Sequence, residues 1–302
     1  MYSIIVPVYN EDQNINILNE RLEKTLNLIN IDYEIIYIND GSTDNSEIKI
    51  KQVMLKNSNI KLINFLTNFG QHSAIIAGLK IAKGDYMITL DADLQNPPEE
   101  IPKLIKEVEN NYDMICGVRK YRKDSFFRKF FSKIMNKVIS KLVKCNLKDF
   151  GCMMRVYKRS LVNEIVTYGD KSVYIPAFAA FLTKNIKEVN IEHNSRNSGL
   201  SNYNFSKLLN QSFDLIVTYT LFPIQLIFKT GAFIFIIGCL LFVYLLYHRF
   251  IVGSPSSLTT FIAILILLSG IIMLSIGIVS EYLIRIYRES KKFPSYIIRK
   301  DD

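Results

Sequence analysis

Two long apolar runs near the C-terminus place the strongest constraint on how this chain can fold. They cover Gly231–Tyr247 and Leu258–Ile278, and between residues 230 and 280 the only charged residue is Arg249. An α-helix needs about 20 apolar residues to cross the hydrocarbon core of a membrane. The second run meets this length, and the first does so once residues 224–228 extend it. We therefore predict two transmembrane helices joined by a short loop.

The charges around this hairpin indicate its orientation. Six Lys or Arg residues follow the second run within residues 285–302, against one Arg in the loop. Because basic residues are retained on the cytoplasmic side, we expect the tail and the segment before the hairpin both to be cytoplasmic. The predicted organisation is a cytosolic domain over 1–222, a transmembrane hairpin over 223–284 and a basic tail over 285–302. A buried helical pair in a soluble protein is the alternative.

The first 118 residues alternate between strand-like and helix-like segments. Apolar, β-branched runs predict strands at 3–9, 33–39, 61–65, 86–90 and 113–118. Amphipathic segments near 13–30, 44–56, 71–82 and 99–110 are expected to form helices between them. This alternation predicts an α/β fold with a doubly wound, mostly parallel sheet and helices on both of its faces.

Polar residues gather where four of these strands end. They are Asn10 and Glu11, the segments 40–44 and 68–72, and the pair Asp91 and Asp93. Doubly wound sheets bind ligands beyond the carboxyl ends of their strands. Residues i and i+2 of an extended segment point the same way, so Asp91 and Asp93 can hold one divalent cation and leave its other positions for water and substrate phosphates. A polar turn with an aspartate cap is the alternative.

Several classes of binding site are not expected, because the sequence lacks their motifs. The sequence contains no G-x-G and no G-x-x-x-x-G-K-[ST], so neither a dinucleotide fingerprint nor a P-loop is expected. Its four cysteines form no C-x-x-C pair, which argues against a zinc site and for a reduced, cytosolic domain.

The formal net charge of +9 is concentrated in one block. Residues 119–159 hold fourteen Lys or Arg residues against only Asp124 and Asp149. Within the block, Phe126–Lys144 places apolar side chains at helical spacing beside six basic residues, a pattern typical of a helix lying on a lipid bilayer. A surface helix packed on the sheet is the alternative. Nucleic acid is not expected as a partner, because no base-reading motif is present.

The polar segments also carry a resemblance to a known family. The motifs are Val6-Pro-Val-Tyr-Asn-Glu11, Asn39-Asp-Gly-Ser-Thr-Asp44, Asn68-Phe-Gly-Gln-His72, Asp91-Ala-Asp-Leu-Gln-Asn-Pro-Pro-Glu-Glu100, Asp149-Phe-Gly-Cys-Met-Met-Arg155 and His193-x-x-Arg196-x-x-Gly199-x-Ser201-x-Tyr203. With them the chain resembles the polyprenyl-phosphate glycosyltransferases of family 2, which have the GT-A fold. It is most similar to those that transfer 4-deoxy-4-formamido-L-arabinose, with dolichol-phosphate mannose synthases and bactoprenol glucosyltransferases as wider kin. Asn202 departs from the pattern, since many relatives carry Lys there.

The resemblance implies roles for particular residues. The base and ribose of a UDP-sugar are expected near Pro7, Tyr9, Glu11 and Asp40. A divalent cation, Mg²⁺ or Mn²⁺, is expected on Asp91 and Asp93, with Gln95 reaching it. Arg119, Arg128 and Arg196 are candidates for holding the acceptor phosphate or the diphosphate, because a planar guanidinium matches phosphate oxygens.

Asp149 corresponds to a residue counted as catalytic in the related enzymes. A phosphate monoester has its second pKa at about 6, so much of a lipid-phosphate acceptor is already dianionic at neutral pH. Little proton abstraction is then required. Two roles are therefore open for Asp149, that of a general base and that of a group orienting the acceptor or supporting the metal.

The resemblance implies an inverting, metal-dependent transfer of the sugar from a UDP-sugar to undecaprenyl phosphate in the bacterial inner membrane. It also implies a homo-oligomer, because related enzymes are tetramers. The donor is expected to be the formamido-arabinose of lipid A modification, because Tyr174-Ile-Pro-Ala-Phe178 in the donor wall (171–181) resembles those transferases. Glucose or another hexose is the alternative. A processive polysaccharide synthase would resemble its family only with a Gln-x-x-Arg-Trp element, and it is disfavoured because the chain has no Trp. An inactive membrane scaffold is disfavoured because Asp91, Asp93 and Asp149 are all kept.

Overall fold

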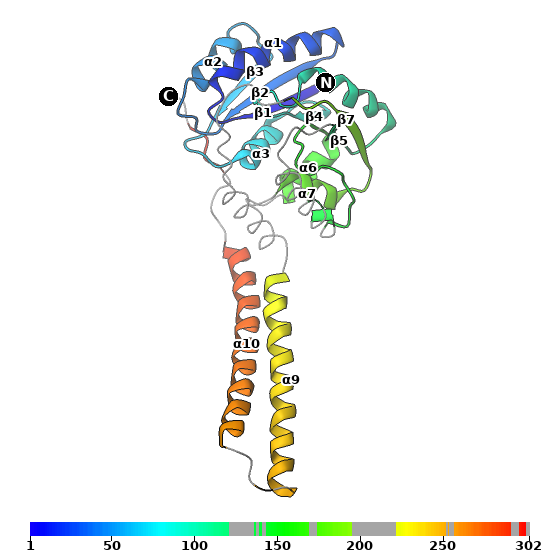
Figure 1. Cartoon of the computed structure of the whole chain (residues 1–302). Helices are drawn as coiled ribbons and strands as arrows, with labels where there is room; N and C mark the ends of the chain where they lie inside the picture. Colours follow the sequence, from blue (N-terminus) through cyan, green and yellow to red (C-terminus); the bar gives the residue numbers. More distant parts are fainter. Residues whose placement is uncertain are drawn as a thin grey trace. The chain divides into compact units, whose positions relative to one another are not determined.

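The computed structural model describes residues 1–120, 136, 139–140, 143–168, 174–194, 222–251, 253, 257–290 and 296–299. The chain divides into two units. The first consists of Met1–Asn204 with Pro294–Asp302, and the second of Phe205–Phe293. Figure 1 shows that the labelled strands belong to the first unit, whereas the second contributes two long helices.

The first unit is built on a seven-stranded sheet with the order β3-β2-β1-β4-β6-β5-β7. The strands are β1 (Tyr2–Val8), β2 (Tyr33–Asn39), β3 (Ile60–Asn64), β4 (Tyr86–Thr89), β5 (Met114–Arg119), β6 (Arg155–Lys158) and β7 (Ile186–Ile191). β6 runs antiparallel to its neighbours β4 and β5, and the other pairs are parallel. The predicted α/β fold with a mostly parallel sheet is confirmed.

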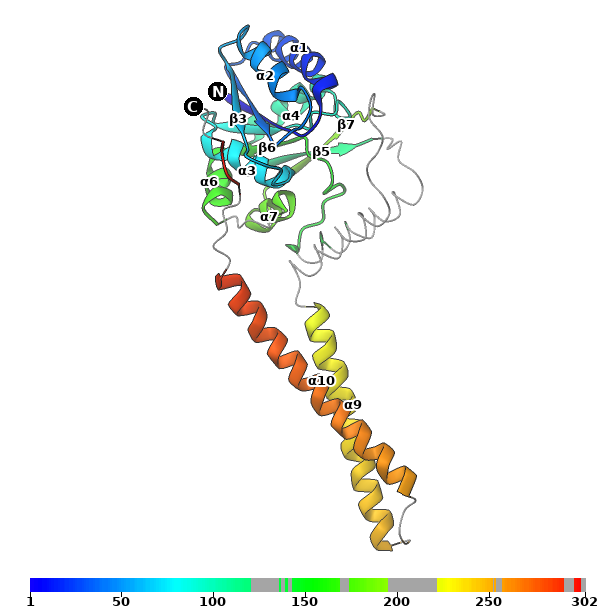
Figure 2. The ribbon, with the colours of Figure 1, turned by 90° about the vertical axis from the view of Figure 1, so that its left-hand side faces the viewer.

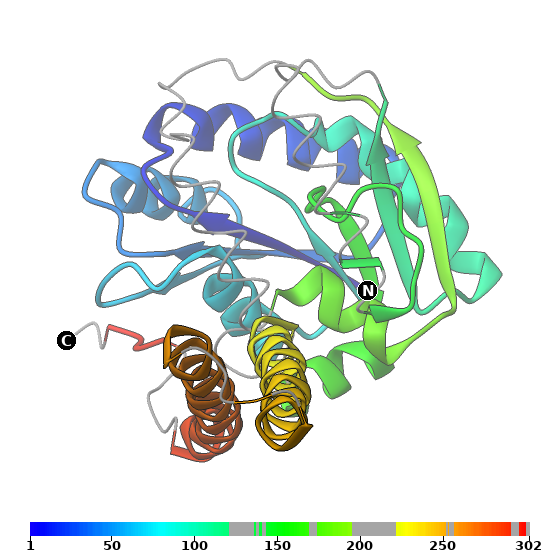
Figure 3. The same ribbon diagram turned by 60° about the horizontal axis from the view of Figure 1, so that its bottom comes forward.

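Helices cover both faces of this sheet (Figures 1 and 3). One apolar core includes residues of α1 (Asp12–Leu28), α2 (Ser46–Met54) and α4 (Ile101–Ile105). The other includes residues of α3 (Gln71–Ile81), α6 (Arg159–Tyr168) and α7 (Ile175–Leu182). In α1 the buried residues Ile15, Leu18, Leu22 and Leu26 recur every three or four positions. Burying a side chain of this kind stabilises the fold by about 1.5–3 kcal/mol.

The segment predicted as one helix near 99–110 is divided into three parts. A 3-10 turn, η1 (Pro98–Glu100), precedes α4, and a second one, η2 (Lys106–Asn110), follows it. Pro98 and Pro102 each lie at the start of one of these pieces. Proline lacks the N–H that a helix interior requires, so each of them starts a new turn rather than continuing a helix.

The second unit contains α9 (Phe222–Ile251) and α10 (Ser257–Ser290), which lie side by side (Figure 2). Both are long and apolar enough to cross a membrane, and most of their residues are exposed. The two backbones approach closely at glycines. A Cβ added to Gly270 would lie 2.6 Å from the backbone N of Phe235, and one on Gly238 would lie 2.9 Å from the Cα of Leu267. Small residues at such contacts are typical of helices that pack in lipid.

The C-terminal segment 296–299 returns to the first unit, where it lies beside β3 (Figure 2). Phe65 and Ile298 form an antiparallel bridge. Residues on both sides of the hairpin in the sequence therefore belong to the same folded unit.

Candidate active site

The carboxyl ends of β1 and β4 are neighbours at the point where the strand order reverses. From β1 the chain proceeds to β2 and β3 on one side, and it then returns to β4 on the other side of β1. Open α/β sheets bind ligands at such a switch point. Tyr9 and Glu11 follow β1, while Asp91 and Asp93 follow β4. The fold thus brings together two of the polar groups that the sequence singled out.

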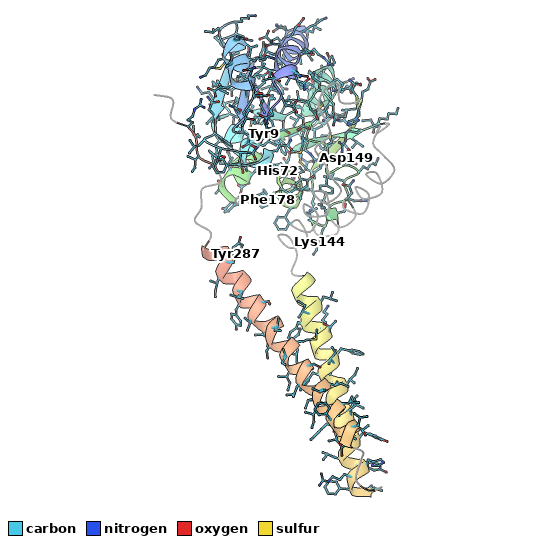
Figure 4. All side chains as sticks on the ribbon, turned by 60° about the vertical axis from the view of Figure 1, so that its left-hand side comes forward. Tyr9, His72, Lys144, Asp149, Phe178 and Tyr287 are labelled. Carbon is cyan, nitrogen blue, oxygen red and sulfur yellow. The ribbon has the colours of Figure 1, made fainter. Side chains whose placement is uncertain are left out.

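The loops after β1 and β2 are tied to each other by hydrogen bonds. The backbone N of Asn10 donates to Ser42 Oγ (3.0 Å), and that of Thr43 donates to Asn10 Oδ1 (2.8 Å). Asn10 adopts a left-handed conformation with φ of 54°. Tyr9, which precedes it, is 48% exposed and labelled in Figure 4. Pro7 is instead buried within β1.

Asp40 organises the loop that leads into α3. Its carboxylate accepts hydrogen bonds from the backbone N of Phe69 (2.7 Å), the backbone N of Gly70 (2.9 Å) and the side chain of Asn68 (3.0 Å). Burial raises the pKa of Asp40, and the two backbone donors oppose that shift. The residue expected near the ribose therefore holds the loops after β2 and β3 together.

Asp91 and Asp93 lie on a tight turn after β4. Leu94, at the centre of this turn, has φ of 60°, a conformation that costs a non-glycine residue about 1–2 kcal/mol. The backbone N of Gln95 donates to Asp93 Oδ1 at 3.1 Å, and Gln71 Nε2 donates to Asp91 Oδ1 at 2.5 Å. Strain of this kind is tolerated where the surroundings fix the backbone, and it is common at functional sites.

The electrostatics of Asp91 show which charges surround it. Burial, followed by repulsion from Asp93, raises the pKa of Asp91 to about 7. Arg119 opposes this rise, and Glu11 adds to it. Charges from the ends of β1, β4 and β5 therefore act on one carboxylate, as expected if these strand ends line a common site.

The donor set fits a hard divalent cation that completes its coordination with substrate. Among the described residues, no group of three or more His, Cys, Asp or Glu side chains gathers into a metal cluster. Mg²⁺ usually takes one or two protein carboxylates and fills its other positions with phosphate oxygens and water. Asp91 and Asp93 supply two carboxylates, and their mutual repulsion would be relieved by a cation between them.

Arg119 and Asp149 form a buried ion pair. Arg119 ends β5, and its Nε and Nη2 donate to the two carboxylate oxygens of Asp149 at 2.7 and 2.8 Å. Both side chains are largely buried, with exposures of 10% and 4%. Gly151 donates its backbone N to Asp149 Oδ1 at 3.1 Å. The sequence singled out both residues but did not predict that they bind each other.

Arg155, for which the sequence predicted no role, fixes the loop that carries Asp149. Arg155 is fully buried at the start of β6. Its guanidinium donates to the carbonyl oxygens of Asp149, Phe150 and Cys152 at 2.8–3.0 Å, and also to Cys116 Sγ. The position of Asp149 thus depends on an arginine that pairs with backbone carbonyls. Its place at the end of the Asp149–Arg155 motif was the only signal for it.

His72 and Tyr174 meet at the side of the site formed by α3 and α7. Their rings contact edge to face with centroids 5.0 Å apart, and Tyr174 Oη donates to the carbonyl of Phe150 at 2.5 Å. Burial, and secondarily the charge of Arg155, lowers the pKa of His72 to about 4, so the ring is neutral. Tyr174 of the predicted donor wall therefore contacts the strand-end residue His72. Figure 4 labels His72 together with Phe178 and Asp149.

Some predicted site residues lie outside the described part of the chain. They are Arg128 and Arg196, together with Asn202, most of the basic segment 126–144 and residues 171–173 of the donor wall. Their expected contacts with phosphate, lipid or sugar remain predictions.

Comparison with known proteins gives a consistent result over the whole chain. The family model described as "Glycosyl transferase family 2" matches residues 3–166. The undecaprenyl-phosphate 4-deoxy-4-formamido-L-arabinose transferase of Proteus mirabilis is 38% identical over 99% of this chain and 93% of its own length. That of Yersinia enterocolitica is also 38% identical, over 99% of this chain and 92% of its own length.

Solved structures resemble most of the chain in fold. Glucosyl-3-phosphoglycerate synthase from Mycobacterium tuberculosis, solved with Mn²⁺ and UDP-glucose, matches with a TM-score of 0.53 and 16% identity. The match covers 72% of this chain and 77% of that one. The same enzyme in complex with Mn²⁺, UDP and glucosyl-3-phosphoglycerate gives a TM-score of 0.52 at 15% identity, covering 72% of this chain and 80% of that one. At this level of identity the likeness concerns the fold, and it confirms the predicted GT-A architecture.

Proposed function

The chain belongs to glycosyl transferase family 2, and we propose that it moves a sugar from a UDP-sugar to undecaprenyl phosphate at a membrane surface. One observation carries the proposal. The similarity to undecaprenyl-phosphate transferases extends over 99% of the chain, and so includes the two apolar helices as well as the catalytic fold. A soluble acceptor would not require a hairpin of this length.

In this proposal the donor lies across the carboxyl ends of β1 and β4. Tyr9 and Glu11 bind the nucleoside end, and the loop organised by Asp40 forms the adjoining wall. Asp91 and Asp93 would hold Mg²⁺ or Mn²⁺, which supplies positive charge for the diphosphate and for the departing UDP. Charge that develops on the leaving group is further stabilised by Arg119, whose field already reaches Asp91.

We assign Asp149 the orienting role rather than that of a general base. Both of its oxygens accept hydrogen bonds from Arg119, so proton transfer to Asp149 would disturb a buried ion pair. The acceptor phosphate has a second pKa of about 6 and needs no strong base. Asp149 holds the Arg119 guanidinium in a fixed direction, and a guanidinium has five N–H donors with which to bind phosphate oxygens as well.

The same chain arrangement supports a cytoplasmic catalytic unit. Segment 296–299, which follows α10, pairs with β3, so the chain before and after the hairpin lies on one side of any membrane that α9 and α10 cross. The six basic residues within 285–302 favour the cytoplasmic side of the bacterial inner membrane.

The donor sugar is proposed to be 4-deoxy-4-formamido-L-arabinose, on the basis of these same relatives. Competition between this UDP-sugar and UDP-glucose, with undecaprenyl phosphate as acceptor, tests the choice. We expect the formamido-arabinose product to dominate, because a pocket discriminates strongly when the wrong sugar leaves its polar groups unpaired. Transfer of glucose at equal or greater efficiency would assign the chain to the glucosyltransferases and leave the lipid-phosphate acceptor unchanged.

A further inference from the structure

The C-terminal segment pairs with the chain at the end of the edge strand β3, next to the proposed donor site. β3 is the outermost strand on its side. The backbone N of Leu66 donates to the carbonyl of Ile297 (2.9 Å), and that of Arg299 donates to the carbonyl of Asn64 (2.8 Å). An edge strand exposes unpaired backbone groups that favour pairing with another segment. Here they pair with the tail, at the end of β3 from which the loop to α3 departs.

An aromatic chain of contacts leads from the tail to Asp40. The ring of Tyr296 stacks on Phe65 with centroids 5.0 Å apart and planes inclined by 8°. Phe65 in turn contacts Phe69 edge to face at 5.7 Å. The backbone N of Phe69 donates to Asp40 Oδ1 at 2.7 Å. Lys80 adds a cation–π contact, with Nζ 5.3 Å from the Tyr296 ring centre. Stacking by Tyr296 therefore supports the loop that Asp40 holds.

A chain of hydrogen bonds leads from the tail to the loop after β2. Arg299 Nη2 donates to Glu47 Oε1 at 2.5 Å, and Asn64 Nδ2 donates to the same oxygen at 3.4 Å. Asn39 Nδ2 donates to Asn64 Oδ1 at 3.0 Å, and the backbone N of Ser42 donates to Asn39 Oδ1 at 3.1 Å. Asn39 and Asn64 are buried, so the middle of this path is shielded from water, whereas Arg299 and Glu47 at its start are partly exposed. Ser42 is the residue whose hydroxyl binds the loop after β1.

We propose that Tyr296 and Arg299 are positioning residues for the donor nucleotide, holding the loops after β2 and β3 in the shape that binds it. The two paths start at neighbouring positions of one short segment and converge on residues 40–42, beside Tyr9 and Glu11. Neither residue is expected to touch the donor. The inference rests on the proposed function, because it is the nucleotide-binding role of these loops that gives the tail its effect.

Binding of UDP in the presence of Mn²⁺, measured by calorimetry on the full-length protein in detergent, tests this role. We expect Tyr296→Ala and Arg299→Ala each to raise the Kd for UDP about 3- to 10-fold, the size of effect given by loss of one aromatic or charged contact. The KM for UDP-sugar should rise in parallel. The KM for undecaprenyl phosphate should stay unchanged, because both paths end in the loops proposed to bind the nucleotide.

Two control variants separate positioning from general stability. Tyr296→Phe keeps the stacked ring and should bind UDP as the wild type does. Arg21→Ala removes another surface ion pair, in which Arg21 of α1 donates to the carboxylate of Glu99 at 2.6 and 2.8 Å. This variant should leave UDP binding unchanged. A merely structural tail would lower the Tm of the alanine variants without changing the Kd of the folded protein. That outcome would overturn the inference.

The remaining outcomes distinguish failure of the positioning role from failure of the proposed function. Suppose that the wild-type protein binds UDP and forms glycolipid, and that the tail variants match it in Kd and in both KM values. This result would overturn the inference and leave the proposed function standing. Wild-type protein that binds no UDP with Mn²⁺ would overturn both.

Discussion

The paired geometry of Arg119 and Asp149 gives the sharpest prediction about mechanism. If Asp149 acts by orienting Arg119, the two side chains form one functional unit, and removing either one disables the same interaction. If Asp149 is an independent base, each removal acts separately. A double-mutant cycle with Arg119→Met and Asp149→Asn distinguishes these cases, because side chains that act as a unit show strongly non-additive effects.

The expected magnitude follows from the burial of the pair. Removal of one preorganised donor from a water-excluded site lowers the rate about 10²- to 10³-fold. We expect Arg119→Met to lower kcat/KM by this factor and Asp149→Asn to lower it by a similar or smaller one. The double variant should then be no worse than Arg119→Met alone. If the two roles were independent, the two losses would instead multiply, and kcat/KM would fall about 10⁴- to 10⁶-fold in the double variant.

The assay is the initial rate of glycolipid formation with the UDP-sugar varied at saturating undecaprenyl phosphate. Because removing one partner of a buried ion pair destabilises a protein by about 3–5 kcal/mol, the Tm of each variant must be measured beside its rate. Arg21→Met, which breaks the exposed pair with Glu99, is a matched control and should keep wild-type activity. Multiplicative losses in folded protein would refute the orienting role and assign Asp149 as a base.

Three further changes probe the metal, the topology and the hairpin. Asp91→Asn with Asp93→Asn should lower transfer by orders of magnitude while the Tm is kept, because the ligand charge disappears and the volume does not; full activity in excess chelator would contradict this. A cysteine replacing Ser257 should react with an impermeant thiol reagent from outside intact cells, with wild type as the control, and labelling only after lysis would reverse the orientation. Gly270→Leu should separate the two helices and lower the Tm in detergent, whereas Ser269→Ala, at an exposed neighbouring position, should not; an unchanged Tm in Gly270→Leu would exclude the close contact.

The parts of the fold that the sequence predicts are those in which local pattern and burial agree. β2 spans Tyr33–Asn39, the range predicted for it, because its centre, Ile35 to Ile38, is fully buried and leaves a continuous apolar signal in the sequence. Asp91 and Asp93 were singled out for a related reason. They come directly after a buried strand, and the carboxyl end of a parallel strand is where a ligand would bind.

The parts that were missed depend on contacts between distant segments. β6 has only four residues and starts with Arg155, a charged residue whose burial is possible because three backbone carbonyls accept its hydrogen bonds. The Arg119–Asp149 pair joins positions 30 residues apart. Segment 296–299 reads as the end of a basic tail, and its place beside β3 follows from an exposed sheet edge that no local pattern reveals.

Transfer to the lipid phosphate is tested by incubating the purified protein with undecaprenyl phosphate, Mn²⁺ and a panel of UDP-sugars, and by measuring released UDP and glycolipid with mass spectrometry. We expect one glycolipid, with the sugar linked to the lipid phosphate and one UDP released for each molecule formed. Release of UDP without glycolipid would show a hydrolase, and absence of both products with every donor would contradict the proposed function altogether.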